Sequence, residues 1–272
     1  GQCLLTLTGH EDVLTSAIFS PDAVRILTAS DDNTAKIWSA ESGQCLLTLM
    51  GHHGWVYSAV FSPDAKRVLT ASVDCTAKIW SLESGQCLLT LMGHEDEVCW
   101  ATYSPDATRV LTASEDGTAR IWCTDSGQCL LTLMGHHGWV YSAVFSPGAE
   151  RVLTASVDCS AKIWCAESGR CLLTLTGHED SVLSAVFSPD ATLALTASCD
   201  GPAKIWSAET GRCLFTLTGH EEEVLSATFS PDASQVLTAS ADGTAKIWNA
   251  ESGQCLITLR DHGRVVNSAA WA

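Results

Sequence analysis

The strongest constraint on this sequence is a 42-residue unit that recurs in tandem with no change of register. One cysteine position marks it throughout, at Cys3, Cys45, Cys87, Cys129, Cys171, Cys213 and Cys255. We divide the 272 residues into six copies and a partial seventh, at 1–42, 43–84, 85–126, 127–168, 169–210, 211–252 and 253–272. Units of this kind share a continuous core and are not stable alone. The sequence therefore predicts one repeat domain over residues 1–272.

Each copy has the pattern of four short β-strands separated by turn residues. In the second copy we expect strands at 45–49, 56–61, 67–72 and 77–80. Short strands with links of a few residues are typical of an antiparallel meander. No segment carries a helical period long enough to compete, so the predicted fold class is all-β.

The second strand of the unit carries small residues at its middle. Five copies read Ser-Ala there, at Ser16-Ala17, Ser58-Ala59, Ser142-Ala143, Ser184-Ala185 and Ser226-Ala227. Strands that converge on a central axis need small side chains at that point, and radial repetition leaves only short sheet edges exposed. The pattern favours a β-propeller of four-stranded antiparallel blades with this strand innermost.

With these residues laid out, the chain resembles the WD-repeat β-propeller family over its whole length. A Gly-His pair, a Phe-Ser-Pro-Asp corner, a Leu-Thr-Ala-Ser strand, an Asp turn and a Lys/Arg-Ile-Trp strand recur in order, with small variations. The usual Trp-Asp dipeptide is absent, and the last copy has Asp261-His262 in place of Gly-His.

The resemblance implies a hydrogen-bonded tetrad of His, Ser or Thr, Asp and Trp in each blade. Its hydroxyl in the first copy would be Thr28 or Ser30. The other members would be His10, Asp32, Trp38, His52, Asp74, Trp80, His94, Asp116, Trp122, His136, Asp158, Trp164, His178, Asp200, Trp206, His220, Asp242 and Trp248. We interpret these residues as structural, because six copies of a catalytic triad would serve no purpose and such a relay satisfies buried polar groups. No catalytic residue is predicted.

The last blade would be incomplete in a ring of this family. The plan that we favour has seven blades, known here as six repeats and a half, with an inner strand at 265–271 and an outer strand at 3–7. The missing strands would lie outside this sequence or come from another chain; a six-bladed ring with frayed ends is the alternative. An open edge invites association. Since the chain begins without Met, we expect it to be a processed, excised or incompletely known piece.

Positions that vary between nearly identical copies are the candidate partner-binding residues. They lie in the loop that enters the innermost strand and just beyond it, on the face where this family usually recruits partners. We predict His53, Trp55, Tyr57, Glu95, Glu97, His137, Trp139, Tyr141, Glu179, Glu221 and Glu223. Aromatic rings beside carboxylates suit a partner that carries Lys or Arg. The alternatives are that Trp55 and Trp139 pack at the blade tops, or that His53 and His137 with nearby carboxylates bind a metal.

Net charge limits the class of partner. Fifteen Lys and Arg against 31 Asp and Glu give a formal charge of −16, which repels nucleic acid and anionic membranes. We expect a non-enzymatic scaffold that binds a protein or peptide, with a basic partner favoured, and with no cofactor or metal. The alternative is an architectural subunit or module of a larger complex that has no ligand of its own.

The thirteen cysteines form no Cys-x-x-Cys pair, and seven of them are one structural position repeated. We expect reduced, buried thiols, which suits a cytosolic compartment. No signal peptide or long apolar run is visible, so an intracellular, cytoplasmic location is predicted.

Overall fold

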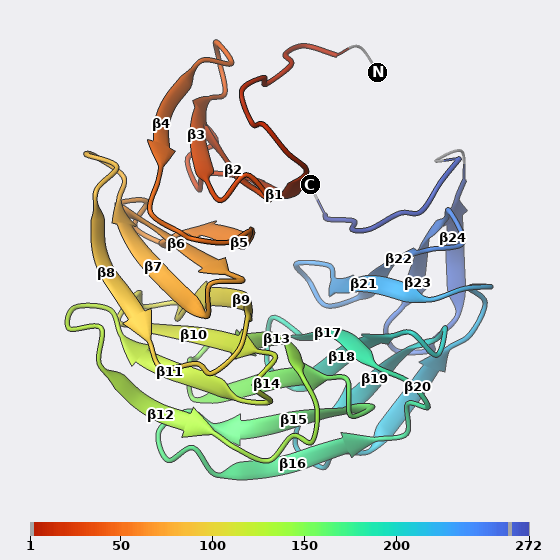
Figure 1. Ribbon diagram of the computed structural model, residues 1–272. Helices are drawn as coiled ribbons and strands as arrows, with labels where there is room; N and C mark the ends of the chain where they lie inside the picture. The colour runs from red at the N-terminus through yellow and green to blue at the C-terminus, as the bar shows by residue number, and fades with distance from the viewer. Residues whose placement is uncertain (1–2, 261–262, 272) are drawn as a thin grey trace. The chain divides into compact units, whose positions relative to one another are not determined.

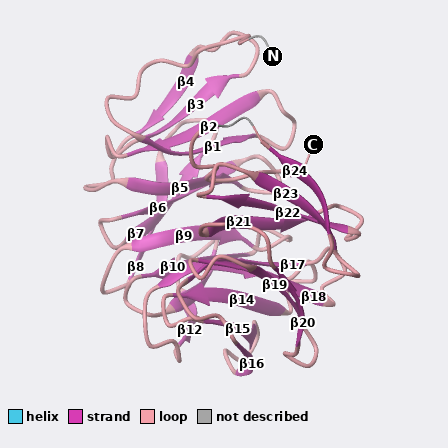
Figure 2. Cartoon of the chain, turned by 90° about the vertical axis from the view of Figure 1, so that its right-hand side faces the viewer, coloured by secondary structure: helices cyan, strands magenta, loops and turns pink. Residues whose placement is uncertain are grey.

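The computed structural model describes residues 3–260 and 263–271 (Figure 1). The predictions that fall on Gly1 and on the Asp261-His262 pair lie outside these residues. Six four-stranded sheets make up the described chain, and in each the strands are neighbours in chain order. Figure 2 shows the strands joined by loops and turns. Among the described residues, no helix is long and apolar enough to cross a membrane.

The strands repeat from sheet to sheet with almost constant bounds. The first sheet contains β1 (Leu14–Phe19), β2 (Arg25–Ser30), β3 (Ala35–Ser39) and β4 (Cys45–Leu49). The second contains β5 (Val56–Phe61), β6 (Arg67–Ser72), β7 (Thr76–Ser81) and β8 (Cys87–Met92). The third contains β9 (Val98–Tyr103), β10 (Arg109–Ser114), β11 (Ala119–Cys123) and β12 (Cys129–Leu133).

The remaining three sheets follow the same plan. The fourth contains β13 (Val140–Phe145), β14 (Arg151–Ser156), β15 (Ser160–Cys165) and β16 (Cys171–Thr176). The fifth contains β17 (Val182–Phe187), β18 (Leu193–Ser198), β19 (Ala203–Ser207) and β20 (Cys213–Leu217). The sixth contains β21 (Val224–Phe229), β22 (Gln235–Ser240), β23 (Ala245–Asn249) and β24 (Cys255–Leu259).

The predicted meander is confirmed. In the second copy, β4, β5 and β6 have the predicted bounds, and β7 is one residue longer at each end than the predicted 77–80. The first strand of a copy is the last strand of the preceding sheet, since β4 pairs with β3 and β8 pairs with β7. All pairings are antiparallel, as the short links require.

The strands predicted at 3–7 and 265–271 are wrong, because neither segment forms a strand. Each would need the two middle strands of a seventh sheet as hydrogen-bonding partners, and without a ladder an extended segment is not held as a strand. Val266 is nevertheless buried, and its backbone N–H donates to the carbonyl of Ser240 at 3.0 Å. The seven-bladed plan stays a prediction.

The core lies between the faces of consecutive sheets. Leu27, Ile37 and Leu49 of the first sheet pack with Val56 and Trp80 of the second. The same cluster recurs between the second and third sheets, the fourth and fifth, and the fifth and sixth. A four-stranded sheet cannot cover its own apolar faces, so each one depends on its neighbour.

Contacts divide the chain into two compact units, residues 1–132 and 133–272. Within the first unit the leading strands β1, β5 and β9 contact one another in sequence, and within the second β13, β17 and β21 do so. Small side chains allow this approach: Ala59 of β5 and Ala143 of β13 are almost fully buried.

The prediction of buried cysteines is wrong. The seven cysteines of the repeated position are exposed, the other six are half-buried, and all thirteen are free thiols. Except for Cys3, the repeated cysteine begins the outermost strand of its sheet, where the burial pattern starts with exposed residues and reaches the core only near the end of the strand. An apolar run on an edge strand can therefore leave its first side chains in solvent.

Candidate functional site

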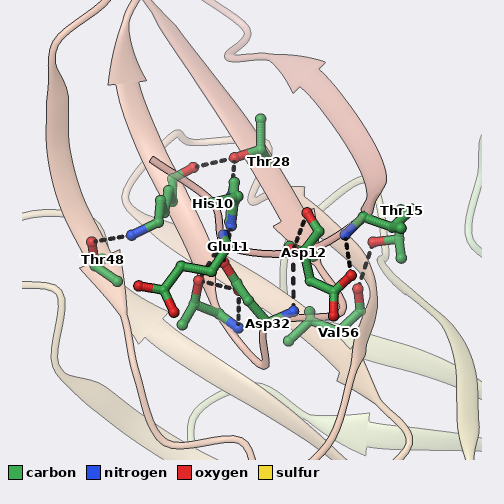
Figure 3. Close-up of polar contacts among 12 residues, drawn as sticks. His10, Glu11, Asp12, Thr15, Thr28, Asp32, Thr48 and Val56 are labelled. Carbon is green, nitrogen blue, oxygen red and sulfur yellow. Dashed lines mark hydrogen bonds and ion pairs between the residues drawn. The ribbon is translucent and has the colours of Figure 1, made fainter. Parts of the chain in front are cut away.

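The turn end of each sheet carries a polar network, shown for the first sheet in Figure 3. His10 enters from the loop before β1, and its Nδ1 lies 2.7 Å from Asp32 Oδ2 in the turn between β2 and β3. Its Nε2 lies 2.7 Å from Thr28 Oγ1 on β2. Trp38 on β3 donates its indole N–H to the same hydroxyl at 2.8 Å. Four side chains therefore join two strands, the turn between them and the loop before β1.

The direction of each hydrogen bond follows from the chemistry of the groups. Indole N–H can only donate, so the Thr28 oxygen accepts from Trp38. The Thr28 hydroxyl therefore donates its proton to His10 Nε2, which accepts. The imidazole N–H then lies on Nδ1 and donates to Asp32. A neutral histidine satisfies every bond in the chain.

The same contacts recur in the other five sheets at 2.7 to 3.0 Å. The hydroxyl that the sequence left open is the threonine in every sheet. Ser30 instead accepts from the Asp32 amide and donates to the Asp12 carbonyl. It closes the turn beside the network and is not a member of it.

The aspartate of each network is held in its ionised form. Burial raises the pKa of Asp32, but hydrogen bonds from the Thr34 hydroxyl, the Glu11 amide and His10 outweigh that effect and lower the pKa to about 2. In the second sheet Asp74 accepts from His52, the His53 amide and both donors of Thr76, and its pKa is lowered as well.

Burial acts on the imidazoles in the opposite direction to their aspartates. It lowers the pKa of His136, His178 and His220, and the hydrogen bond and charge of the partner aspartate raise each pKa without compensating fully. These histidines are therefore neutral at pH 7, as the direction of the hydrogen bonds requires.

The fifth sheet departs from the pattern at one residue. Four other repeats have Thr and one has Ser two positions after the turn aspartate, and each gives the carboxylate a backbone N–H and a hydroxyl. The fifth repeat has Pro202, which has neither donor. The Asp200 carboxylate turns both oxygens toward His178 Nδ1, at 3.0 and 2.9 Å.

A glycine brings each histidine over its tryptophan. Gly51, directly before His52, has φ +145°, and a β-carbon there would lie 3.4 Å from the edge of the Trp80 ring. The rings of His52 and Trp80 are then 6.0 Å apart in an edge-on arrangement. Side chains rarely adopt this φ, so the Gly-His pair is a geometric requirement.

Beside the network in residues 1–132, the structure brings several predicted partner-binding residues together. Tyr57 on β5 donates its hydroxyl to Glu97 Oε2, at the entry to β9, at 2.7 Å. Cys99 on β9 lies 3.9 Å from Glu115 Oε1, to which its thiol donates. Trp55 is 50% exposed, and His53 and Glu95 are exposed beside these groups in sequence. We call Trp55, Tyr57, Glu97, Cys99 and Glu115 the acidic-aromatic cluster.

In residues 133–272 the corresponding residues form two separate groups. Trp139, 44% exposed, meets Tyr141 edge to face at 6.3 Å, and His137 is exposed next to it. Glu221 and Glu223 are exposed and line a cavity of about 390 Å³ together with Glu222, Cys199 and Asp200. Glu179 is exposed, and its backbone N–H donates to Asp200 at 2.9 Å.

A protein-family model described as "WD domain, G-beta repeat" matches six segments of the chain, at residues 1–39, 43–81, 85–123, 127–165, 169–207 and 211–249. The chain belongs to the WD40 repeat family. No curated protein matches it. WD40 proteins are generally scaffolds for protein interactions, are usually non-catalytic and typically bind proteins.

The WD40 network has the connectivity of a nucleophile, a base and an orienting carboxylate. Its hydroxyl is closed to substrate, however, because Thr28 is 2% exposed and the equivalent threonines are equally buried. The hydroxyl also accepts the indole N–H, which holds it in place. A nucleophile must reach a reacting atom in a cleft, and these oxygens do not.

Trp100, beside the acidic-aromatic cluster in sequence, and Glu115, a member of it, were not among the predicted partner-binding residues. Trp100 stands on β9 where five other repeats have the small serine, and it is 37% exposed. The signal was present, since the third copy reads Trp-Ala at the Ser-Ala position. Glu115 was visible as a variable position before the turn aspartate, but only the structure shows its contact with Cys99.

A metal centre was the alternative for His53 and His137. Within the part of the chain that the structure describes, no group of three or more His, Cys, Asp or Glu residues is arranged to hold a metal ion. The two histidines also belong to different units.

Proposed function

We propose that this WD40 chain is a non-enzymatic scaffold that binds a basic segment of a partner protein at the turn ends of its sheets. The acidic-aromatic cluster is the observation that carries this proposal. Its carboxylates lie on loops and strand ends, and its tryptophan is half exposed.

Among the described residues, no Lys or Arg forms an ion pair with Glu97 or Glu115. Burial raises the pKa of Glu115, and the neighbouring charges of Glu97 and Asp96 raise it further. Burial and the same carboxylates raise the pKa of Cys99 to about 12. A Lys or Arg from a partner would relieve this repulsion, so its binding would be favourable at the site itself.

Aromatic side chains add to the same preference. Trp55 is half exposed, and a cation over the face of such a ring gains about 0.5–2 kcal/mol. Tyr57 is also fixed by its bond to Glu97, which leaves little side-chain freedom to lose on binding.

Binding of fluorescent eight-residue peptides with one Arg or Lys among Gly and Ser would test the proposal. We expect Glu97→Gln and Glu115→Gln each to weaken binding about 3–10-fold, and added salt to weaken it further. Glu41→Gln, an exposed carboxylate outside the cluster, is the matched control. Affinity that is unchanged in both cluster variants, or that falls equally in the control, would refute this site. An architectural subunit with no ligand of its own predicts that none of these peptides binds.

A further inference from the structure

A second cleft lies at the opposite end of the strands, between the second and third sheets. It has a volume of about 200 Å³ and is lined in part by Tyr103, Thr124, Arg67 and the carboxylates Asp64, Asp106 and Asp125. Tyr103 ends β9, and Val98 at the other end of that strand follows Glu97. The cleft is therefore distinct from the acidic-aromatic cluster.

The hydroxyl of Tyr103 has no partner in this cleft. The residue is only 7% exposed, and its oxygen is buried with no hydrogen bond to any described residue. A buried hydroxyl without a hydrogen bond is unfavourable, because it has lost water and gained no partner. A ligand that supplies the missing bond recovers that cost.

The polar lining is particular to this pair of sheets. Phe stands at the Tyr103 position in the other five complete repeats, at Phe19, Phe61, Phe145, Phe187 and Phe229. The Thr124 position is Leu82 in the second repeat and Ala in the other four. The equivalent cleft between the first two sheets is lined by Arg25, Lys66 and Leu82, so it is more basic and more apolar.

The charge of the cleft is negative. Arg67 is already engaged, because its guanidinium donates to the Thr124 carbonyl at 3.1 Å and to Asp125 at 3.2 Å. Asp64 and Asp106 are the other two carboxylates that line the cleft. Each accepts a serine hydroxyl, from Ser62 at 2.6 Å and from Ser104 at 2.5 Å, and these bonds lower the pKa of each carboxyl.

We propose that this cleft binds a protonated primary amine on a slim alkyl chain, the chemistry of a lysine side chain. The ammonium group carries three donors, for the Tyr103 oxygen and the carboxylates of Asp64 and Asp106. The volume lies below the ~300–1,000 Å³ of most small-molecule sites and holds a single side chain.

Other ligand classes fit less well. The negative charges of Asp64 and Asp106 repel an anion, despite Arg67. A guanidinium needs a planar, bidentate carboxylate, and Arg67 already takes Asp125. Among the described residues, these carboxylates do not form a group arranged for a metal ion.

Tyrosine-labelled protein provides a direct readout, because the chain has three tyrosines. With ¹³C at the phenolic carbon, the spectrum gives three signals, and Tyr103→Phe identifies its own. We expect butylammonium chloride to shift the Tyr103 signal saturably, and butyltrimethylammonium or 1-butanol at the same concentration and ionic strength not to do so. The Tyr57 signal reports separately on the acidic-aromatic cluster, so failure at one site is distinguishable from failure at the other.

The variant Tyr103→Phe restores the residue of the other repeats, so we expect it to fold. Ligand-observed NMR should show butylammonium binding to it about tenfold or more weakly than to the parent chain. A parallel titration with Nα-acetyl-lysine methylamide identifies the source: binding of both probes supports a partner's lysine, and binding of butylammonium alone supports a free amine. A Tyr103 signal that is unmoved by both amines, or that moves equally with 1-butanol, would overturn the proposal.

Discussion

Replacing Pro202 with threonine would give the fifth repeat the two donors that the other repeats use to hold their turn aspartate. In the first sheet these donors are the Thr34 amide, at 2.9 Å from Asp32, and its hydroxyl, at 2.6 Å. The side chain of Asp200 is 10% exposed and meets neither donor, because proline has no N–H and no hydroxyl. The fifth sheet is thus a natural variant of the network inside the same chain.

The expected gain follows from these contacts. Two hydrogen bonds to a carboxylate contribute about 1.5–3 kcal/mol each when well formed, and a partly solvated carboxylate realises less. Loss of the proline ring costs about 0.4–1 kcal/mol through the unfolded state. We expect Pro202→Thr to raise the free energy of unfolding by about 1–2 kcal/mol and the melting temperature by roughly 2–8 °C.

Calorimetry and urea unfolding would measure the change, and amide hydrogen exchange in β17–β20 would place it in the fifth sheet. Pro202→Val restores the N–H but not the hydroxyl, so it should recover about half of the gain. In an Asp200→Asn background the gain should mostly disappear, as a double-mutant cycle requires for a direct interaction. A threonine variant no more stable than the valine variant, or a full gain without the carboxylate, would refute the reasoning.

Three further outcomes are expected. Because the folded pKa values of His136, His178 and His220 are lowered, the unfolded chain binds protons before the folded chain as pH falls below about 6.5, so the unfolding free energy should decline there. It should decline again below about pH 4, as aspartates such as Asp32 lose their ionised form. Urea titrations that give constant stability from pH 7.5 to 5 would contradict this. The repeated, exposed cysteines should react with iodoacetamide in the folded protein. Cys99 should react slowly, because burial and the charge of Glu115 raise the pKa of its thiol to about 12. Mass spectrometry of the labelled peptides would measure these rates, and equal rates would contradict the prediction. Gly51→Ala should lower the free energy of unfolding, measured in urea, by about 1–3 kcal/mol, because φ is +145° and the added carbon would lie against Trp80. Gly148→Ala is the control and should be near neutral, since its added carbon would meet nothing closer than 3.9 Å. Equal effects of the two variants would show that the Gly-His geometry is not required.

The sequence alone determined the period, the bounds of the strands within the six sheets to about one residue in the second copy, and the His, Asp and Trp of each polar network. Strand bounds could be read because turn residues and alternation are local, and a repeat averages out the ambiguity of any one copy. The network residues were found through the family resemblance, and their types left few ways to satisfy buried polar groups. Local sequence could not decide between Thr28 and Ser30, because the two residues lie two apart on β2 and share one face of the strand. Only the position of His10 selects Thr28.

Tertiary structure decided the properties that depend on what a neighbouring sheet covers. An apolar run predicts burial, yet Cys45 and its equivalents lie in solvent, and β4 is buried only at its far end. Likewise, Tyr57 and Glu97 are 40 residues apart, and Tyr103 and Arg67 line one cleft across two sheets. Such pairings arise from the docking of sheet faces, and a pattern within one repeat carries no information about them.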